Sequence, residues 1–253
     1  MLTNRQQQCL QGIGIQVWSE RQAVPGDRSA SEPVAEAGSD PVSRTEADVI
    51  EGSTTVIPVS PVAETSIPES FASWDSIIDA IHTCDACELA QNCTQKVPGV
   101  GDRHADLLII GEGPGHEEDI RGEPFVGRSG QLLDRMLAAI GISREQVYIT
   151  NIVKCRPPNN RDPKPHEAQQ CRAYLEAQIE QLAPRVILSV GRVSAHNLLN
   201  TSQPVGKLIK QMHKLPGTEI PVKVTYHPAY LLRNPSAKAI AWQDLKLLYQ
   251  MLQ

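Results

Sequence analysis

The sequence is poor in aromatic residues and has no long apolar run. Phe, Trp and Tyr make up 4% of the 253 residues, and only two of them are Phe. No stretch approaches the ~20 consecutive apolar residues that a membrane-spanning helix needs. Residues 1–5 also lack the apolar segment of a secretory signal. We therefore expect a cytoplasmic protein that makes no contact with a membrane.

Charge is distributed unevenly along the chain. The formal net charge of −5 divides into −6 over residues 1–70, −7 over residues 71–150 and +8 over residues 151–253. A basic C-terminal part suits a polyanion such as nucleic acid. An ordinary solvated surface explains the same charge equally well, so charge alone leaves both interpretations open.

Composition divides the chain into three parts. Residues 1–24 form a short segment that is too small to bury a core of its own. Residues 25–70 are acidic, rich in Pro and Ser and without a sustained period, which predicts a disordered linker. Residues 71–253 have the apolar pattern of a folded domain. An apolar segment followed by a flexible linker is typical of a partner-binding peptide; the apolar residues of this segment include Leu10, Ile13, Ile15 and Trp18.

Within residues 71–253, short apolar runs alternate with segments of helical period. Strands are predicted over residues 107–110, 147–150, 186–190 and 222–226. Helices are predicted over residues 74–81, 129–141, 165–182, 192–199 and 237–252. This alternation favours an α/β fold in which helices cover both faces of a parallel sheet.

Two loops follow predicted strands and carry chemically informative residues. Gly-Glu-Gly-Pro-Gly occupies residues 111–115, and His-Pro-Ala-Tyr-Leu-Leu-Arg occupies residues 227–233. Loops at the carboxyl ends of parallel strands converge on one crevice, where ligands bind. Glycines let the backbone approach such a ligand closely. The sequence therefore predicts an active site between these two loops.

Cysteine spacing is compatible with a metal site. Disulfides are not expected in a cytoplasmic protein. Cys84-x-x-Cys87 has a spacing common among metal ligands, and Cys155 and Cys171 are able to complete a set of four thiolates. The alternative is that cysteines serve as small buried apolar residues. We favour that alternative for the two others, Cys9 and Cys93.

Further motifs follow in a fixed order along the chain. Gly-Glu-Pro-Phe-Val-Gly lies at residues 122–127, Thr-Asn-Ile-Val-Lys-Cys-Arg-Pro-Pro at 150–158, and Asn-Pro follows the histidine loop. With the cysteines and the glycine-rich loop, this set resembles the iron–sulfur (family 4) uracil-DNA glycosylases over about two-thirds of the chain. The resemblance implies a catalytic domain over residues 71–253, folded as an α/β/α sandwich with a four-stranded parallel sheet. It also implies a [4Fe–4S] cluster on Cys84, Cys87, Cys155 and Cys171.

An enzyme that removes a base from DNA must first extrude that base from the stack into a pocket. In light of the resemblance, we expect Phe125 to stack on the base, Asn151 to read the uracil edge and His227 to stabilise the departing anion. Gly113 lies in the loop that approaches the substrate. Each assignment has a structural alternative: a core phenylalanine, an asparagine closing a strand end, and a histidine capping a turn.

The remaining candidates act around the base. Glu112 and Glu118 are both candidates for positioning the attacking water or stabilising a cationic sugar, and each is also interpretable as a solvated acid. Leu231 is the candidate wedge for the gap left in the DNA, or else the start of a buried patch. Arg233 is expected to grip a phosphate. Asn160 is expected to contact the DNA strand.

The first residues resemble a different protein. Residues 5–21 are similar to the N-terminal peptide of the psi subunit of bacterial DNA polymerase III, which docks on the chi subunit. The favoured hypothesis is a monofunctional uracil-DNA glycosylase that is tethered to chi through this peptide. The alternatives are a non-catalytic, psi-like clamp-loader accessory protein and a zinc-bound DNA-binding module.

Overall fold

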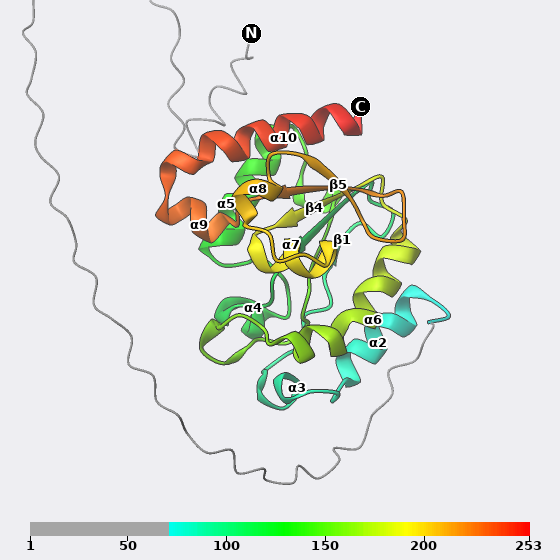
Figure 1. Cartoon of the computed structure of the whole chain (residues 1–253). Helices are drawn as coiled ribbons and strands as arrows, with labels where there is room; N and C mark the ends of the chain where they lie inside the picture. Colours follow the sequence, from blue (N-terminus) through cyan, green and yellow to red (C-terminus); the bar gives the residue numbers. More distant parts are fainter. Residues whose placement is uncertain (1–70) are drawn as a thin grey trace, which may run out of the picture. The chain divides into compact units, whose positions relative to one another are not determined.

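The computed structural model describes residues 71–253, and residues 1–70 lie outside the described part (Figure 1). The predicted peptide at residues 1–24 and the predicted linker at residues 25–70 therefore remain predictions. Within the described range, no helix is long and apolar enough to cross a membrane.

The centre of the domain is a mixed six-stranded sheet with the order β1-β3-β2-β4-β6-β5. The four inner strands are mutually parallel, and β1 and β5 pair antiparallel at the two edges. The parallel strands correspond to the four predicted from the sequence. The strands are β1 (Val100–Gly101), β2 (Leu107–Gly111), β3 (Tyr148–Asn151), β4 (Val186–Val190), β5 (Met212–Lys214) and β6 (Pro221–Thr225).

The two edge strands were not predicted, for a physical reason. They span two and three residues, too few to show an alternating pattern. The inner strands are recognisable because nearly every residue is buried, which makes β2 and β4 predominantly apolar runs.

Helices cover both faces of the sheet (Figure 1). Within residues 71–253, the five predicted helices are present, together with four short helices that were not predicted. The helices are α2 (Trp74–Thr83), α3 (Glu88–Asn92), α4 (His116–Arg121), α5 (Arg128–Ala139), α6 (Pro165–Leu182), α7 (Arg192–Leu199), α8 (Val205–Leu208), α9 (Pro228–Arg233) and α10 (Lys238–Leu252). The described part of the chain also contains the short 3-10 turns η1 (Arg144–Gln146), η2 (Pro158–Asn160) and η3 (Pro235–Ala237).

Alternation along β2 divides the core into two clusters. Leu107 and Ile109 pack with α5 and α10 on one face, whereas Leu108 and Ile110 pack with α6 on the other. Successive side chains of a strand point to opposite faces, so one apolar strand serves both clusters. The sheet is thereby fixed from both sides. Its strand ends can then hold the loops that follow in a defined arrangement.

Candidate active site

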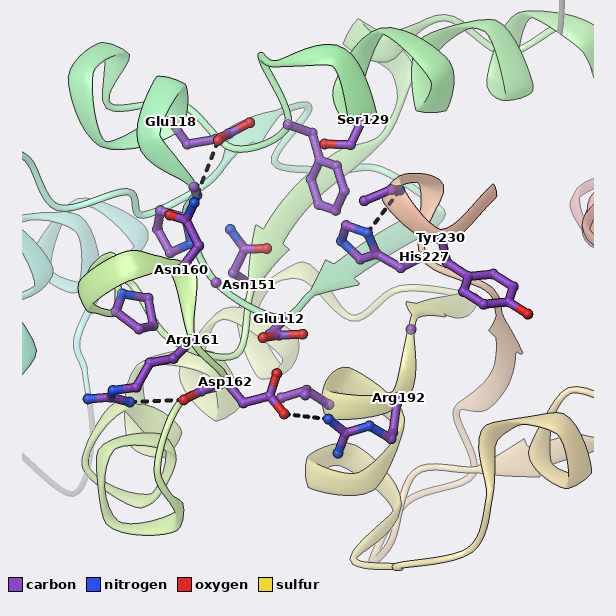
Figure 2. Close-up of a pocket in the computed structure, with 18 of the residues that line it drawn as sticks. Glu112, Glu118, Ser129, Asn151, Asn160, Arg161, Asp162, Arg192, His227 and Tyr230 are labelled. Carbon is purple, nitrogen blue, oxygen red and sulfur yellow. Dashed lines mark hydrogen bonds and ion pairs between the residues drawn. The ribbon is translucent and has the colours of Figure 1, made fainter. Parts of the chain in front are cut away.

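A cavity of about 780 Å³ lies beyond the carboxyl ends of the parallel strands (Figure 2). Its walls come from the loops after β2, β3, β4 and β6, as the convergence of strand ends predicts. The candidates from the sequence that line it are Glu112, Gly113, Glu118, Phe125, Asn151, Asn160, His227 and Arg233. The cavity therefore joins residues that are more than 100 positions apart in the sequence.

The Phe125 ring is held rigidly at the cavity wall. Its backbone has φ 53°, a left-handed conformation that costs free energy for a residue with a side chain. Arg144 holds this conformation, because its guanidinium donates to the carbonyl oxygens of Pro124 and Phe125. The Phe125 ring stacks on that of His227 with centroids 5.6 Å apart and an interplanar angle of 29°. The aromatic wall is thus fixed before any ligand binds.

Asn151 ends β3 and is 2% exposed. Within residues 71–253, its Oδ1 is the one buried side-chain oxygen or nitrogen without a hydrogen-bond partner. A Cβ at Gly111 would collide with this oxygen and approach the Phe125 ring to 2.7 Å, so the position requires glycine. Buried polar atoms are almost always paired, and an unpaired one at a cavity calls for a ligand donor.

Lys154 braces the strand end that carries Asn151. Its Nζ donates to the Asn151 carbonyl oxygen at 2.9 Å, to Thr150 Oγ1 at 2.6 Å and to Gln178 Oε1 at 2.7 Å. Burial lowers the pKa of this lysine to about 7. This role of Lys154 was not predictable from the sequence pattern, because it depends on burial of the side chain between β3 and α6.

His227 is the N-cap residue of α9. Its Nδ1 accepts a hydrogen bond from the Ala229 backbone N–H at 3.2 Å. Burial, together with the positive charge of Arg233, lowers the pKa of His227 to about 4. The imidazole is therefore neutral near pH 7, and because Nδ1 accepts, its proton is on Nε2. Gly191, with φ +93°, leaves room for this ring, since a Cβ there would lie 3.0 Å from the His227 Cβ.

The two candidate glutamates have different environments. The Glu118 carboxylate is 8% exposed and accepts from the backbone N–H groups of Gly115, Val126 and Gly127 at 3.0–3.1 Å. It therefore fastens the start of α4 to the loop that follows Phe125. Burial raises the pKa of Glu112 to about 7, with further contributions from the charge of Asp162 and a hydrogen bond to it.

The structure corrects the wedge predicted at Leu231. This side chain is 1% exposed and packs in the core beside α5 and α10, so it cannot enter DNA. Its neighbours Tyr230 and Leu232 are each 38% exposed.

Asn160 lines the cavity, and its Oδ1 accepts from Arg156 Nε at 2.8 Å.

A second hollow adjoins the cavity and has a basic rim. The cavity and the hollow share Ser129, Ala229 and Arg233. Exposed Arg121 and Arg128 join Arg233 in lining it. No ion pair to another residue of the 71–253 range is found for these three arginines. Their guanidinium groups are thus available for phosphate.

The four candidate thiols come from three segments. Cys84 follows α2 and Cys87 precedes α3 in one short segment, Cys155 follows β3, and Cys171 lies on α6. Burial raises the pKa of Cys155, and the charges of Cys93, Cys171 and Cys87 add to this rise. Cys171 interacts similarly with Cys87 and Cys84, so the thiols lie in one region. In the described part of the chain, no group of three or more His, Cys, Asp or Glu side chains is placed to hold a single metal ion.

Comparison with known proteins assigns the fold to a family. The Uracil DNA glycosylase superfamily profile matches residues 98–246, which contain every strand and the whole cavity. The chain belongs to this superfamily.

Within the superfamily, it belongs to the type-4 group. The chain is 42% identical over 181 residues to the type-4 uracil-DNA glycosylase of Archaeoglobus fulgidus, a match covering 69% of this chain and 90% of that protein. It is 43% identical over 178 residues to that of Thermotoga maritima, covering 67% and 90%. The type-5 uracil-DNA glycosylase of Pyrobaculum aerophilum is more distant, with 29% identity over 155 residues, covering 55% and 68%.

Proposed function

We propose that this chain hydrolyses the N-glycosidic bond of deoxyuridine in DNA and leaves an abasic site. The observation that carries the proposal is the unpaired Asn151 oxygen, buried beside a fixed aromatic ring and a neutral imidazole in one cavity. A site of this kind provides a stacking wall, a selective amide and a hydrogen-bond donor for a leaving group.

Base recognition is assigned to Asn151 and Phe125. The Asn151 Oδ1 accepts from uracil N3–H, and its amide nitrogen donates to uracil O4. Cytosine has no N3 hydrogen and carries a donor at the 4-position, so it leaves this amide mispaired at a cost of ~1–3 kcal/mol. Stacking on Phe125 contributes ~1–3 kcal/mol without choosing the base.

Stabilisation of the leaving group is assigned to His227. As the glycosidic bond breaks, negative charge develops on the uracil O2, and the His227 Nε2–H donates to it. A neutral donor is sufficient, because the interaction strengthens only as the charge develops in the transition state. The stack with Phe125 and the Ala229 N–H bond hold the imidazole in place beforehand.

Water activation is assigned to Glu112. The carboxylate stabilises the cationic sugar that forms as uracil leaves. Water then adds to C1′, and Glu112 accepts the proton that the water loses. A pKa of about 7 suits this role, since a useful fraction of the group is ionised at neutral pH while its basicity is raised. Glu118 is assigned a positioning role, because three backbone donors already occupy its carboxylate.

We assign binding of the DNA backbone to the basic hollow. Arg121, Arg128 and Arg233 supply phosphate contacts there, and Asn160 approaches the strand on the other side of the cavity. Leu232 replaces Leu231 as the candidate wedge, because it is exposed and lines the hollow.

We further propose a [4Fe–4S] cluster on Cys84, Cys87, Cys155 and Cys171. The chemistry of the donor set fits, since all four are free thiols, Cys155 and Cys171 are buried, and Cys171 lies near enough to Cys84 and Cys87 for their charges to affect its pKa. When bound, the cluster supplies a cross-link between these segments. We assign the cluster a structural role, because Cys155 and Cys171 lie at the two ends of the segment that carries Asn160. Iron and sulfide analysis with visible absorbance tests this, and a colourless, zinc-containing protein would favour the zinc module.

The decisive experiment uses an oligonucleotide with one uracil. Incubation with the full-length protein, followed by alkali, is expected to break the strand at that position and to spare a thymine-containing control. Before alkali the strand should remain intact, because the activity is monofunctional. No scission above background would reject the activity and favour the non-catalytic accessory role.

The proposed chi partner concerns residues 5–21, outside the described part of the chain. Deleting residues 1–24 is expected to leave uracil excision unchanged and to abolish binding to chi in a pull-down. A chi interaction that survives the deletion would reject the tether. The cytoplasmic location likewise stays a prediction.

A further inference from the structure

We propose that Asp162 and Arg192 are positioning residues for Glu112, with Asp162 sharing a hydrogen-bonded proton with Glu112 and Arg192 holding Asp162 in place. The inference rests on the proposed function, because it assigns the groups that set the ionisation of the water-activating carboxylate.

The three residues come from three separate strand ends. Glu112 follows β2, Asp162 lies in the loop after β3, and Arg192 begins α7 after β4. All three line the cavity, and Figure 2 shows Glu112 and Asp162 with their carboxylates facing one another. The Arg192 guanidinium donates to Asp162 Oδ2. After burial, the charge of Asp162 contributes to the raised pKa of Glu112, as expected for two carboxyl groups that face one another across the cavity.

Asp162 is held by its neighbour. Arg161 makes two hydrogen bonds to the Glu167 carboxylate, at 2.8 and 2.6 Å, and Glu167 is fully buried at the start of α6. The same guanidinium donates to the Asp162 backbone oxygen at 2.9 Å. Two bonded carboxylate oxygens give this anchor a defined geometry. The loop therefore presents Asp162 to Glu112 in one fixed orientation.

The folding of the domain does not explain the Arg192–Asp162 pair. Both side chains are more than half exposed, at 52% and 58%, and exposed ion pairs contribute little to stability. Arg192 is also the first residue of a helix, where the helix dipole disfavours a positive charge. A locally unfavourable residue that lines an active-site cavity is better explained by function.

The chemistry follows from like charge at short range. Two adjacent carboxylates resist simultaneous ionisation, and a shared proton relieves the repulsion. Arg192 acts in the opposite direction by favouring the ionised state. The other charged or titratable side chains of the cavity are Glu118, Arg161, Tyr226, His227, Tyr230 and Arg233. Burial raises the pKa of Glu112 most, Asp162 adds to this rise and Arg192 opposes it, so that Glu112 is close to half ionised at neutral pH.

The test is the pH profile of kcat/KM for Asp162→Asn and Arg192→Gln on uracil-containing DNA. Asp162→Asn removes a negative neighbour, so the acid limb should move about one unit lower. At about pH 6 this raises the active fraction about fivefold relative to wild type. Arg192→Gln should move the limb about one unit higher, with about fivefold loss at about pH 7. Shifts of opposite sign from two partners of one ion pair would not arise from a purely structural role.

Two measurements separate this inference from the proposed function. Arg172→Gln, which removes an exposed ion pair with Glu176 on α6, should leave the profile unchanged. A ¹³C NMR titration of glutamate-labelled protein, with Glu112→Gln for assignment, reports the Glu112 carboxyl without DNA. Opposite shifts of that titration in the two variants support the inference even if wild type excises no uracil. Unchanged titrations, or shifts of one sign, would overturn it while leaving glycosylase activity intact.

Discussion

Truncating Asn151 to Ala is expected to make the protein more stable and less active. In the free protein this side chain has a buried oxygen without a donor, and no hydrogen bond joins it to another residue of the 71–253 range. A buried unsatisfied polar atom costs ~1–3 kcal/mol, and Ala removes that cost. Truncation also forfeits packing worth about 1 kcal/mol, so the expected net gain is about 1 kcal/mol.

For a domain of this size, a gain of about 1 kcal/mol corresponds to a Tm higher by ~2–4 °C. Loss of the uracil contacts should cost ~1–3 kcal/mol in kcat/KM, about 5- to 150-fold. Calorimetry at one scan rate measures the first quantity, and single-turnover excision measures the second.

Gln178→Ala is the matched control for Asn151→Ala. Gln178 is a fully buried amide with both ends bonded, to Lys154 Nζ at 2.7 Å and to the Pro98 oxygen at 3.0 Å. Its loss removes one of the three hydrogen-bond acceptors of the buried Lys154 Nζ and should lower the Tm. If Asn151→Ala also lowered the Tm and retained full excision, the unpaired Oδ1 would not be a ligand-binding atom. This outcome would refute our reasoning about the cavity.

Further predictions concern catalysis, the DNA wedge and the thiols. His227→Ala should lower kcat by ~10²–10³-fold with little change in DNA affinity by gel shift; the reverse pattern would remove its catalytic role. Because the pKa of Glu112 is about 7 and that of His227 about 4, kcat/KM should rise with pH through neutrality as Glu112 ionises, and a profile limited only below pH ~5 would contradict this. Leu231→Ala should cost ~2–5 kcal/mol in chemical unfolding. Leu232→Ala should stay within ~0.5 kcal/mol of wild type and impair excision from duplex DNA, and unimpaired excision would reject the wedge. Cys155→Ser should lose iron and visible absorbance, so retention of full iron content would exclude it as a ligand.

Much of the fold is readable from the sequence because the inner strands are buried on both faces. Residues 107–110 form an uninterrupted apolar run, residues 186–190 are interrupted by Ser189 alone, and helices of ordinary length lie between them. The parallel sheet in turn predicts that loops after β2 and β6 meet, and the structure places Phe125, Asn151 and His227 around one cavity. Their catalytic and binding roles remain proposals.

The features that the sequence did not predict depend on fine geometry. Leu231 and Leu232 are adjacent and chemically identical, and α9 has only six residues, so no periodicity indicates which one is buried. Arg144 and Asp162 act through contacts between residues distant in sequence. Arg192 differs from these, because its position is visible in the sequence: it places a cation at the start of a predicted helix, where the helix dipole disfavours positive charge. Such a residue indicates a functional role.

Lys154 connects two regions that perform different tasks. Its backbone N–H donates to Cys171 Sγ at 3.4 Å, while its ammonium group holds the strand end of Asn151. Lys154 therefore connects the thiol of Cys171 to the strand end that carries Asn151, the amide that we assign to base selection. Oxidation of that thiol would act on a residue that contacts both. Selectivity for uracil over other bases would then fall when the thiols are oxidised.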